Sequence, residues 1–354
     1  MKRFISILIS VVTLLLASFF AGCESQGDYA DFYNFTTQIH VEVYTGKLSD
    51  EVRTQIKDTL NELEDAFSIS KSTSLPARFN ALQQSQTITL TQMEKDVIEK
   101  AFWGYEFTQG RFNPAVYPLS TLWGFAPNFN KDNFVKPTTD QIDQILTSNI
   151  LDFDSVATFT DNTLTKTVTD AKMDLGGIVK GYACDLIARI LKNEGFTNGY
   201  VNVGGSSLNL LHVKSLAITH PRKEGQILKF TKELIDLSVS TSGDYERYFT
   251  DNDTRYCHII DSNSGAPIQT GIQSVTVVCP NGMVADILST ALCLCEYSQA
   301  NDTLTPLMNK IIQTLPSTKM FVVLENQDGK QLVTNTKKGE QFTLLDNDYS
   351  VVEI

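Results

Sequence analysis

The sequence lacks the basic clusters that mark a nucleic-acid-binding protein. It carries 29 Lys and Arg against 41 Asp and Glu, a formal net charge of −12. The basic residues are scattered rather than grouped, so the charge pattern argues against nucleic acid as a partner. With only 4 histidines in 354 residues, few side chains titrate near neutral pH.

The cysteines also lack any pattern that would indicate a disulfide framework or a metal site. Apart from Cys23 near the N-terminus, an odd number remains: Cys184, Cys257, Cys279, Cys293 and Cys295. A chain of this length buries enough apolar surface without covalent cross-links. We therefore expect these five cysteines to be buried free thiols.

Long apolar runs are absent except at the N-terminus, where Ile7 to Leu16 has no charged residue and is interrupted only by Ser10 and Thr13. This run is shorter than the ~20 residues that a membrane span needs. It follows Lys2 and Arg3 and leads into "FFAGC", the pattern of a bacterial lipoprotein signal peptide. A plain N-terminal membrane anchor is the alternative.

Cleavage before Cys23 would leave a lipidated cysteine at the start of the mature chain. The sequence thus predicts a signal peptide over 1–22, a lipid-bearing polar tether over 23–31 and a folded body over 32–354. The protein would then belong to the cell envelope, held by its lipid on the outer face of the cytoplasmic membrane or in the periplasm.

Hydrophobic periodicity in the body predicts an α+β fold without a steady strand–helix alternation. Alternation over 36–45 indicates a strand, and a helix with Ser49 as its N-cap follows. Thr91 and Glu94 have capping-box spacing and predict a second helix. Further strands are expected at 164–168, 200–203, 216–219, 274–278 and 320–324, and further helices at 177–192, 284–296 and 303–315.

The stretch "MDLGGIVKGYACD" places a glycine pair, Gly176 and Gly177, at the start of an expected helix. Glycines allow close approach of the backbone to a ligand, and the free N–H groups of a helix N-terminus favour an anion. Lys180, one turn further on, would add a positive charge, and Asp174 could accept from a ligand hydroxyl or amine. A strand-to-helix turn that needs glycine only for packing is the alternative.

Three other segments carry polar groups in unusual surroundings. Gly204 and Gly205 follow an apolar strand, and "SVSTSGDYERYF" offers the hydroxyls and amides of Thr241, Ser242 and Gly243 to the polar edge of a ring system, or forms a hydrophilic hairpin loop. His258 lies in an expected apolar strand, near Asp261. A lone strand histidine is either a satisfied core group or a proton acceptor.

In "MVADILSTAL", Asp286 and Thr290 are four residues apart and would share one helix face. A carboxylate, a hydroxyl and a nearby backbone carbonyl are the hard oxygen ligands that Mg²⁺ prefers. This spacing is common in helices, so the segment alone is weak evidence for a metal site.

Taken in order, these segments resemble the ApbE family, the FAD:protein FMN transferases. The resemblance is carried by "RFNAL", "GRFNPAVYPLSTLWGF", "MDLGGIVKGYACD", "VSTSGDYERYF" with "HIIDSNSGAPI", and "VADILSTAL", which span nearly the whole body. It implies an α+β catalytic domain of mixed sheets and helices, either single or built of two intimate subdomains with the FAD site between them.

The resemblance also implies a reaction: Mg²⁺-dependent transfer of FMN from FAD to a Ser or Thr hydroxyl of another protein, with release of AMP. The metal ligands would be the backbone carbonyl of Gly177 with Asp286 and Thr290, and the catalytic residues His258, Asp286 and Lys180. FAD would be bound by Asn80, Phe112, Asn113, Asp174, Lys180, Gly204, Gly205, Thr241, Ser242, Gly243, His258 and Ile259.

His258 is our preferred acceptor of the hydroxyl proton, because an imidazole titrates near working pH. Asp261 and Asp244 remain open as alternatives. The sequence departs from the family pattern at Asn113, Ala115, Ser206 and Cys257, and in "HIIDSNSG". None of these departures removes an expected metal ligand.

Two rival functions fit the same residues: an FAD pyrophosphatase that delivers FMN to water, and a flavin-binding lipoprotein without turnover. Storage of a flavin does not need a metal at the diphosphate, so the segment with Asp286 and Thr290 favours an enzyme. "DILSTAL" comes close to a flavin acceptor motif but ends in Leu292, without a hydroxyl. We therefore expect the acceptor to be a separate exported protein, such as a flavin-carrying subunit of a membrane redox complex.

Overall fold

The computed structural model describes residues 27–130, 132 and 134–354. The expected signal peptide and Cys23 lie outside the described residues. Within the part of the chain that is described, no helix has both the length and the apolar character needed to cross a membrane.

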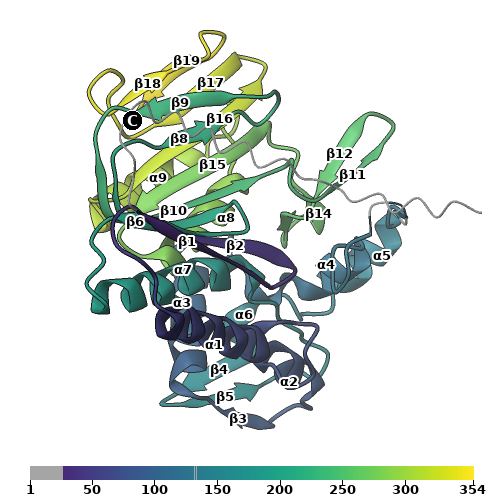
Figure 1. Ribbon diagram of the computed structural model, residues 1–354. Coiled ribbons are helices and arrows are strands. Elements are labelled where there is room, and N and C mark those ends of the chain that lie inside the picture. Colours follow the sequence, from purple (N-terminus) through teal and green to yellow (C-terminus); the bar gives the residue numbers. More distant parts are fainter. Residues whose placement is uncertain (1–26, 131, 133) are drawn as a thin grey trace, which may run out of the picture.

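A nine-stranded sheet forms the centre of the molecule, in the order β1-β2-β6-β7-β10-β15-β16-β17-β19 (Figure 1). Neighbouring strands are antiparallel except for β17 and β19, which are parallel. The strands are β1 (Asp28–Asn34), β2 (Thr37–Val43), β6 (Gly199–Val203), β7 (Ser207–Val213), β10 (Leu234–Gly243), β15 (Ile272–Cys279), β16 (Lys319–Asn326), β17 (Gly329–Thr334) and β19 (Ser350–Glu353).

Helices cover one face of this sheet and bury the largest hydrophobic core against it (Figure 1). They are α1 (Asp50–Phe67), α3 (Gln92–Phe107), α7 (Gly176–Asn193), α8 (Gly282–Cys293) and α9 (Leu304–Thr314). The Oγ of Ser49 caps α1 by accepting from the N–H of Val52, and Thr91 with Glu94 forms the capping box of α3. Both sequence-based helix starts are confirmed.

The other face of the sheet is covered by a three-stranded sheet in the order β18-β9-β8, with a second hydrophobic core between the two layers. Its strands are β8 (Ala217–Thr219), β9 (Gln226–Phe230) and β18 (Phe342–Leu344). The middle of the central sheet, above all β15, is therefore buried on both faces, whereas the edge strand β1 keeps one exposed face.

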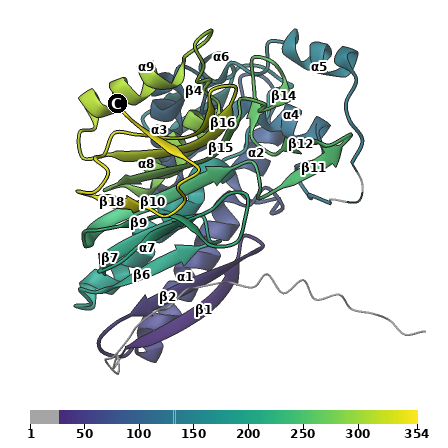
Figure 2. The ribbon, with the colours of Figure 1, turned by 90° about the horizontal axis from the view of Figure 1, so that it is seen from above.

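A smaller cluster of aromatic side chains lies to one side of the sheet, where α4, α5 and the β11–β12 hairpin come together in both views (Figures 1 and 2). Trp123 is 2% exposed and donates from Nε1 to the carbonyl oxygen of Gly265 (2.8 Å). The elements here are η1 (Pro114–Val116), α4 (Tyr117–Leu122), α5 (Thr139–Leu146), β11 (Tyr248–Asp251), β12 (Thr254–Cys257), β13 (Ile260–Asp261) and β14 (Ala266–Pro267).

A further three-stranded sheet, in the order β3-β5-β4, packs with two short helices below the main helical layer (Figure 1). These elements are α2 (Leu75–Ala81), β3 (Thr87–Thr89), α6 (Phe153–Val156), β4 (Ala157–Thr160) and β5 (Thr163–Lys166). The α+β prediction is thus confirmed, and the strands and helices expected beyond residue 160 all occur, with ends that differ by up to three residues. All five expected free cysteines are buried and unpaired.

Three details differ from the sequence analysis. The tether expected over 23–31 is too long, because β1 begins at Asp28 and pairs with β2. His258 is not inside a strand but in the link between β12 and β13. Thr241 to Gly243 form the end of β10 rather than a hairpin loop, because Thr241 and Ser242 pair with Thr276 and Val275 of β15.

Candidate active site

The candidate site lies where α7 and α8 cross, with one glycine from each helix at the crossing point. A Cβ added to Gly181 would lie 2.1 Å from the carbonyl oxygen of Gly282, and one added to Gly282 would lie 2.3 Å from the carbonyl oxygen of Gly181. The two backbones therefore touch. Asp185 holds the crossing, since its Oδ2 accepts from the N–H of Gly282 (2.7 Å) and its Oδ1 from Ser238 Oγ (2.8 Å).

This crossing presses Asp286 of α8 against the first turns of α7. Its side chain is 4% exposed, and its two oxygens accept from the N–H of Gly181 (2.6 Å) and from Ser207 Oγ (2.8 Å). Burial raises the pKa of Asp286, and the positive charge of Lys180 partly opposes that rise. A nearby cation would relieve the same penalty, because it favours the charged carboxylate.

Thr290 lies one turn after Asp286 and close to Gly177. Its Oγ1 is 4.0 Å from the position that a Cβ of Gly177 would take, and 3.3 Å from Ser242 Oγ. In a regular α-helix the N–H of Gly181 points at the carbonyl oxygen of Gly177, and its donation to Asp286 competes with that bond. The structure thus brings the three expected metal ligands to one place.

The donor set suits a hard cation. It offers a carboxylate, a hydroxyl and a backbone carbonyl, with room in the coordination shell for phosphate oxygens and water. Among the described residues, no group of three or more His, Cys, Asp and Glu could hold a metal ion. The residues present therefore fit Mg²⁺ and do not form a zinc-type site.

Lys180 points from α7 toward the turn that joins β6 and β7. Its Nζ donates to Ser206 Oγ (2.5 Å). That turn contains Gly204 and Gly205, whose φ angles of 67° and 75° lie in the left-handed region that favours glycine. The second glycine pair therefore shapes a turn, and the two serines after it reach Lys180 and Asp286.

Asp174 precedes the N-terminus of α7 and faces the same region. Its Oδ1 accepts from the N–H of Gly176 (2.9 Å), and its own N–H donates to the carbonyl oxygen of Pro114 (2.9 Å). Burial raises the pKa of Asp174, while the Gly176 N–H and the charge of Arg247 act in the opposite direction. The first glycine pair is exposed and leaves this helix end open to a ligand.

The amides of Asn80 and Asn113 are engaged with backbone groups. Asn80 bonds both the carbonyl oxygen (3.1 Å) and the N–H (2.7 Å) of Met173, which leads into the glycine turn. Asn113 donates to the carbonyl oxygen of Leu151 (2.7 Å) and accepts from the N–H of Ala115 (2.9 Å). These contacts position the loops around the site, and direct binding of FAD by either amide remains a prediction.

Two other expected flavin contacts, Phe112 and Ile259, are buried apolar side chains. The ring of Phe112 lies 3.3 Å from the position that a Cβ of Gly177 would take. Phe112 therefore forms an apolar wall beside the glycine turn.

His258 keeps a ring nitrogen without a partner. Its Nδ1 is buried and makes no hydrogen bond to any described residue, while its backbone N–H donates to the carbonyl oxygen of Arg247 (2.9 Å). Burial, followed by the charges of Arg247 and Lys180, lowers the pKa of His258 to about 3. The imidazole is therefore neutral at pH 7, but the expectation that it titrates near working pH is wrong for the protein without ligand, because burial and two nearby cations disfavour its protonated form.

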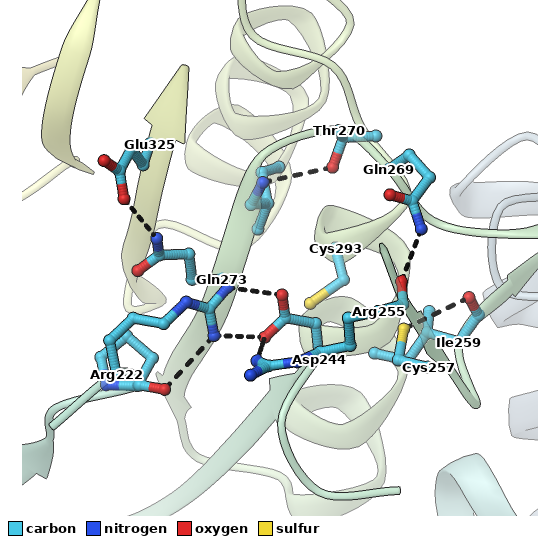
Figure 3. Close-up of polar contacts among 12 residues, drawn as sticks. Arg222, Asp244, Arg255, Cys257, Ile259, Gln269, Thr270, Gln273, Cys293 and Glu325 are labelled. Atoms are coloured by element: carbon cyan, nitrogen blue, oxygen red, sulfur yellow. Dashed lines mark hydrogen bonds and ion pairs between the residues drawn. The ribbon is translucent and has the colours of Figure 1, made fainter. Parts of the chain in front are cut away.

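The two alternative proton acceptors are both occupied. Asp261 accepts from the backbone N–H groups of Asn263 (3.0 Å) and Ser264 (3.2 Å) and so shapes its own turn. Asp244 is held by both terminal nitrogens of Arg222 (2.6 Å each) and by Arg255 (3.3 Å) (Figure 3). This geometry favours His258 over either carboxylate.

The sequence analysis did not assign several residues that shape the site. Ser207 bonds Asp286, Ser206 bonds Lys180, and Ser289, next to Thr290, bonds the expected FAD-binding residue Ser242 (2.8 Å). Both serines of the β6–β7 turn follow a glycine pair that the sequence did flag, so their proximity to that pair was the available signal. Nothing in the sequence links Ser207 to Asp286, which lies 79 residues further along.

Comparison with known proteins shows which family the chain is similar to. The model of the ApbE family matches residues 35–312. The FAD:protein FMN transferase of Vibrio cholerae is 30% identical over 295 residues, covering 80% of this chain and 86% of that protein. The protein of the same name from Escherichia coli is 27% identical over 315 residues, covering 82% and 88%.

The fold of the chain is also similar to that of solved ApbE structures. The flavin transferase ApbE from Vibrio cholerae superposes with a TM-score of 0.75 at 26% identity, covering 87% of this chain and 96% of that one. The ApbE protein from Thermotoga maritima gives a TM-score of 0.73 at 26% identity, covering 85% and 94%. From residues, geometry and comparison together, this chain belongs to the ApbE family.

Proposed function

We propose that this protein is an FAD:protein FMN transferase that moves the FMN half of FAD onto a Ser or Thr hydroxyl of another protein. The proposal is supported by its curated relatives, which carry this name over about four fifths of the chain. The structural observation that carries it is the convergence of Gly177, Asp286 and Thr290 beside Lys180, with a neutral histidine at the same site.

In the transfer, the hydroxyl oxygen of the acceptor forms a bond to the phosphorus of the FMN half. The bond from that phosphorus to the bridging oxygen breaks, and the bridging oxygen leaves with AMP and the electron pair. The products are an FMN phosphodiester on the acceptor, AMP and one proton. The protein must therefore accept a proton on one side and offset negative charge on the phosphate oxygens.

His258 is proposed to take the proton. The support is that its Nδ1 has no hydrogen-bond partner among the described residues and that its imidazole is neutral. Lys180 supplies a fixed positive charge for the phosphate oxygens, and Ser206 orients its ammonium. The N–H of Gly176 is donated to Asp174, so it is the next N–H groups of the first turn of α7, beginning at Gly177, that are offered to an anion.

Mg²⁺ is proposed as the cation at Gly177, Asp286 and Thr290. When bound there, it would offset charge on the diphosphate and act as a Lewis acid. Ser207 and the N–H of Gly181 fix the orientation of the Asp286 carboxylate, so that its remaining lone pairs face a constant direction.

The remaining elements of the proposal concern location. Cys23 would carry a lipid after removal of residues 1–22, and the acceptor would be an exported protein at the membrane surface. The support is the signal-peptide pattern of the sequence. Replacing Cys23 with alanine should move the protein from the membrane fraction to the soluble fraction of the envelope, and unchanged fractionation would refute the lipid anchor.

The test of function is to mix the protein with FAD, Mg²⁺ and a candidate exported acceptor, and to measure the mass of the acceptor. We expect a gain of one FMN on a Ser or Thr peptide and an equal amount of AMP. Rapid formation of free FMN and AMP without any acceptor would instead identify an FAD pyrophosphatase. Bound FAD that is never consumed would identify a storage protein.

A further inference from the structure

One arginine beside the site is not committed to any other group. Arg222 and Arg255 both pair with Asp244 (Figure 3). The guanidinium of Arg255 also lies over the ring of Tyr248, 4.4 Å from its centroid. Arg247 has an exposed side chain and, unlike Arg222 and Arg255, no acidic partner among the described residues. Across the described part of the chain, its guanidinium has neither a hydrogen bond nor an ion pair.

The backbone of Arg247 is nevertheless fixed next to His258. Its carbonyl oxygen accepts from the N–H of His258 (2.9 Å), just before β11 begins at Tyr248. The base of the β11–β12 hairpin is held in turn by Asp244, which binds Arg255 of β12 and Arg222 of the β8–β9 connection. A long cationic side chain thus projects from a well-anchored position.

The charge of Arg247 reaches the site from this position. Its positive charge opposes the rise that burial causes in the pKa of Asp174 at the N-terminus of α7, and it adds to the lowering that burial causes in the pKa of His258 in the β12–β13 link. Two groups from different elements therefore lie within its field. These two groups belong to the glycine turn and to the histidine segment, and the backbone of Arg247 is bonded to the second of them.

The site is short of positive charge for a dinucleotide. Asp174 and Asp286 contribute two carboxylates, and Lys180 is an amine directed at Ser206. A diphosphate adds at least two more negative charges, which one metal ion and one lysine do not fully offset. A guanidinium suits this task, because its planar donors match two phosphate oxygens at once.

We propose that Arg247 binds non-bridging phosphate oxygens of FAD from the hairpin side, as a second fixed cation besides Lys180. The inference rests on FAD being the substrate, as in the proposed function. In the transfer, Arg247 offsets the negative charge that stays on the phosphate oxygens while the bond to the bridging oxygen breaks and AMP leaves.

The test compares the binding of FAD with that of riboflavin, which has the same ring system but no phosphate. Flavin fluorescence titrations are made with the full chain in EDTA, so that FAD is not consumed. For Arg247→Ala we expect the dissociation constant of FAD to rise about tenfold or more and that of riboflavin to stay unchanged. For Arg247→Lys, which keeps the positive charge, the dissociation constant of FAD should rise less.

Arg255→Ala is the matched control, because it removes an arginine from the same hairpin while Arg222 still holds Asp244. It should change neither dissociation constant. An equal loss of FAD and riboflavin binding in Arg247→Ala, or no loss at all, would overturn the inference, as would wild-type protein that binds FAD no more tightly than riboflavin.

The transfer assay separates this inference from the proposed function. If the wild-type protein binds FAD through Arg247 but transfers no FMN to any acceptor in Mg²⁺, the phosphate contact stands and the transferase proposal fails. If Arg247→Ala transfers FMN normally and its affinity for FAD is unchanged, the transferase proposal stands and the phosphate contact of Arg247 fails.

Discussion

Asp286 is the side chain on which most of the site depends. It is buried, it bonds both a helix N–H and Ser207, and burial raises its pKa. Such a carboxylate costs free energy in the folded protein unless a cation lies beside it. A residue kept in this state indicates a function rather than a contribution to stability.

Replacing Asp286 with asparagine should therefore separate function from stability. Asparagine keeps the size of the side chain and can still accept from Gly181, but it has no charge for a cation. We expect FMN transfer to fall about 100-fold or more, with a thermal midpoint equal to or above that of the wild type. Addition of Mg²⁺ with FAD should raise the thermal midpoint of the wild type only.

Ser207→Ala is the graded control for this variant, because it removes one bond to the carboxylate and leaves the carboxylate itself. It should lose less activity than Asp286→Asn. Equal activity of Asp286→Asn and wild type would contradict the role of the carboxylate.

His258 gives a prediction about pH. Its pKa is about 3 in the folded protein against 6.5 in the unfolded chain, so the unfolded chain binds more protons between these values. The stabilising contribution is complete above pH 6.5 and is lost as the pH falls toward 3. Asp174 and Asp286 have raised pKa values, so their contribution to stability increases as the pH falls. Both residues are present in the two proteins that the test compares, so their contribution cancels in the comparison.

The measurement is the free energy of unfolding in urea for wild type and His258→Gln between pH 7 and pH 4. The wild type should lose stability more steeply as the pH falls, with a difference of up to about 1.4 kcal/mol per pH unit. Parallel curves would show that His258 is as easily protonated in the folded protein as in the unfolded chain.

The two helices that carry the metal residues are positioned by their contact at Gly181 and Gly282. A methyl group at residue 181 would overlap the carbonyl oxygen of Gly282 at 2.1 Å, and backbone cannot move aside as a side chain can. We expect Gly181→Ala to destabilise the protein by about 1–3 kcal/mol or more, and to separate Asp286 from α7 so that transfer is lost.

Gly195→Ala tests the same helix without the overlap. Gly195 follows the end of α7 with a φ angle of 85°, and an added Cβ would meet nothing within 4 Å. Only backbone strain of about 1 kcal/mol is expected, with normal transfer. If both variants lost activity alike, the close crossing would not be what positions the site.

The helices were predicted well from the sequence, because a helix cap or an amphipathic stripe is determined by a few neighbouring residues. Ser49 and Thr91 are examples. The end of β10 was harder to predict from the sequence, because this strand contains buried polar residues. Ser238 and Ser240 are hydrogen-bonded to Asn209 and Ser289. Their partners lie far along the chain, and an apolar pattern cannot reveal such pairs.

The molecule as a whole connects its C-terminal layer to the site through His220. The N–H of Arg222 donates to Nδ1 of His220 (3.0 Å), so Nε2 carries the proton and donates to Asp346 (3.0 Å). Asp346 lies just after β18, and Arg222 binds Asp244 next to Gly243. One buried side chain thus links the covering sheet to the end of β10.

Replacing His220 with alanine leaves the Arg222 N–H and one side of Asp346 without their partner. We expect a loss of about 1–3 kcal/mol in the free energy of unfolding, measured in urea at pH 7. Lys223→Ala removes an exposed ion pair to the same Asp346 and should cost less than about 1 kcal/mol. A larger effect at Lys223 would contradict this assignment.

The sequence alone pointed to the segments that make up the candidate site, but not to the contacts that bring these segments together. The glycine-lysine stretch, the His258 segment and the Asp286 helix were each flagged by composition and by the family resemblance. Their assembly depends on the glycine crossing, on Ser207 and on the turn at Gly204, each of which joins residues distant in sequence. A one-dimensional pattern carries no information on such contacts.

The central claim is that one cation is held by the carbonyl of Gly177, the carboxylate of Asp286 and the hydroxyl of Thr290 against the diphosphate of FAD. The most direct test is a crystal structure of the protein with FAD and Mn²⁺ in place of Mg²⁺, with the metal located by its anomalous scattering. We predict one strong peak within about 2–2.3 Å of these three oxygens and of a phosphate oxygen. Bound FAD with the peak elsewhere, or with no peak between these residues, would contradict the account.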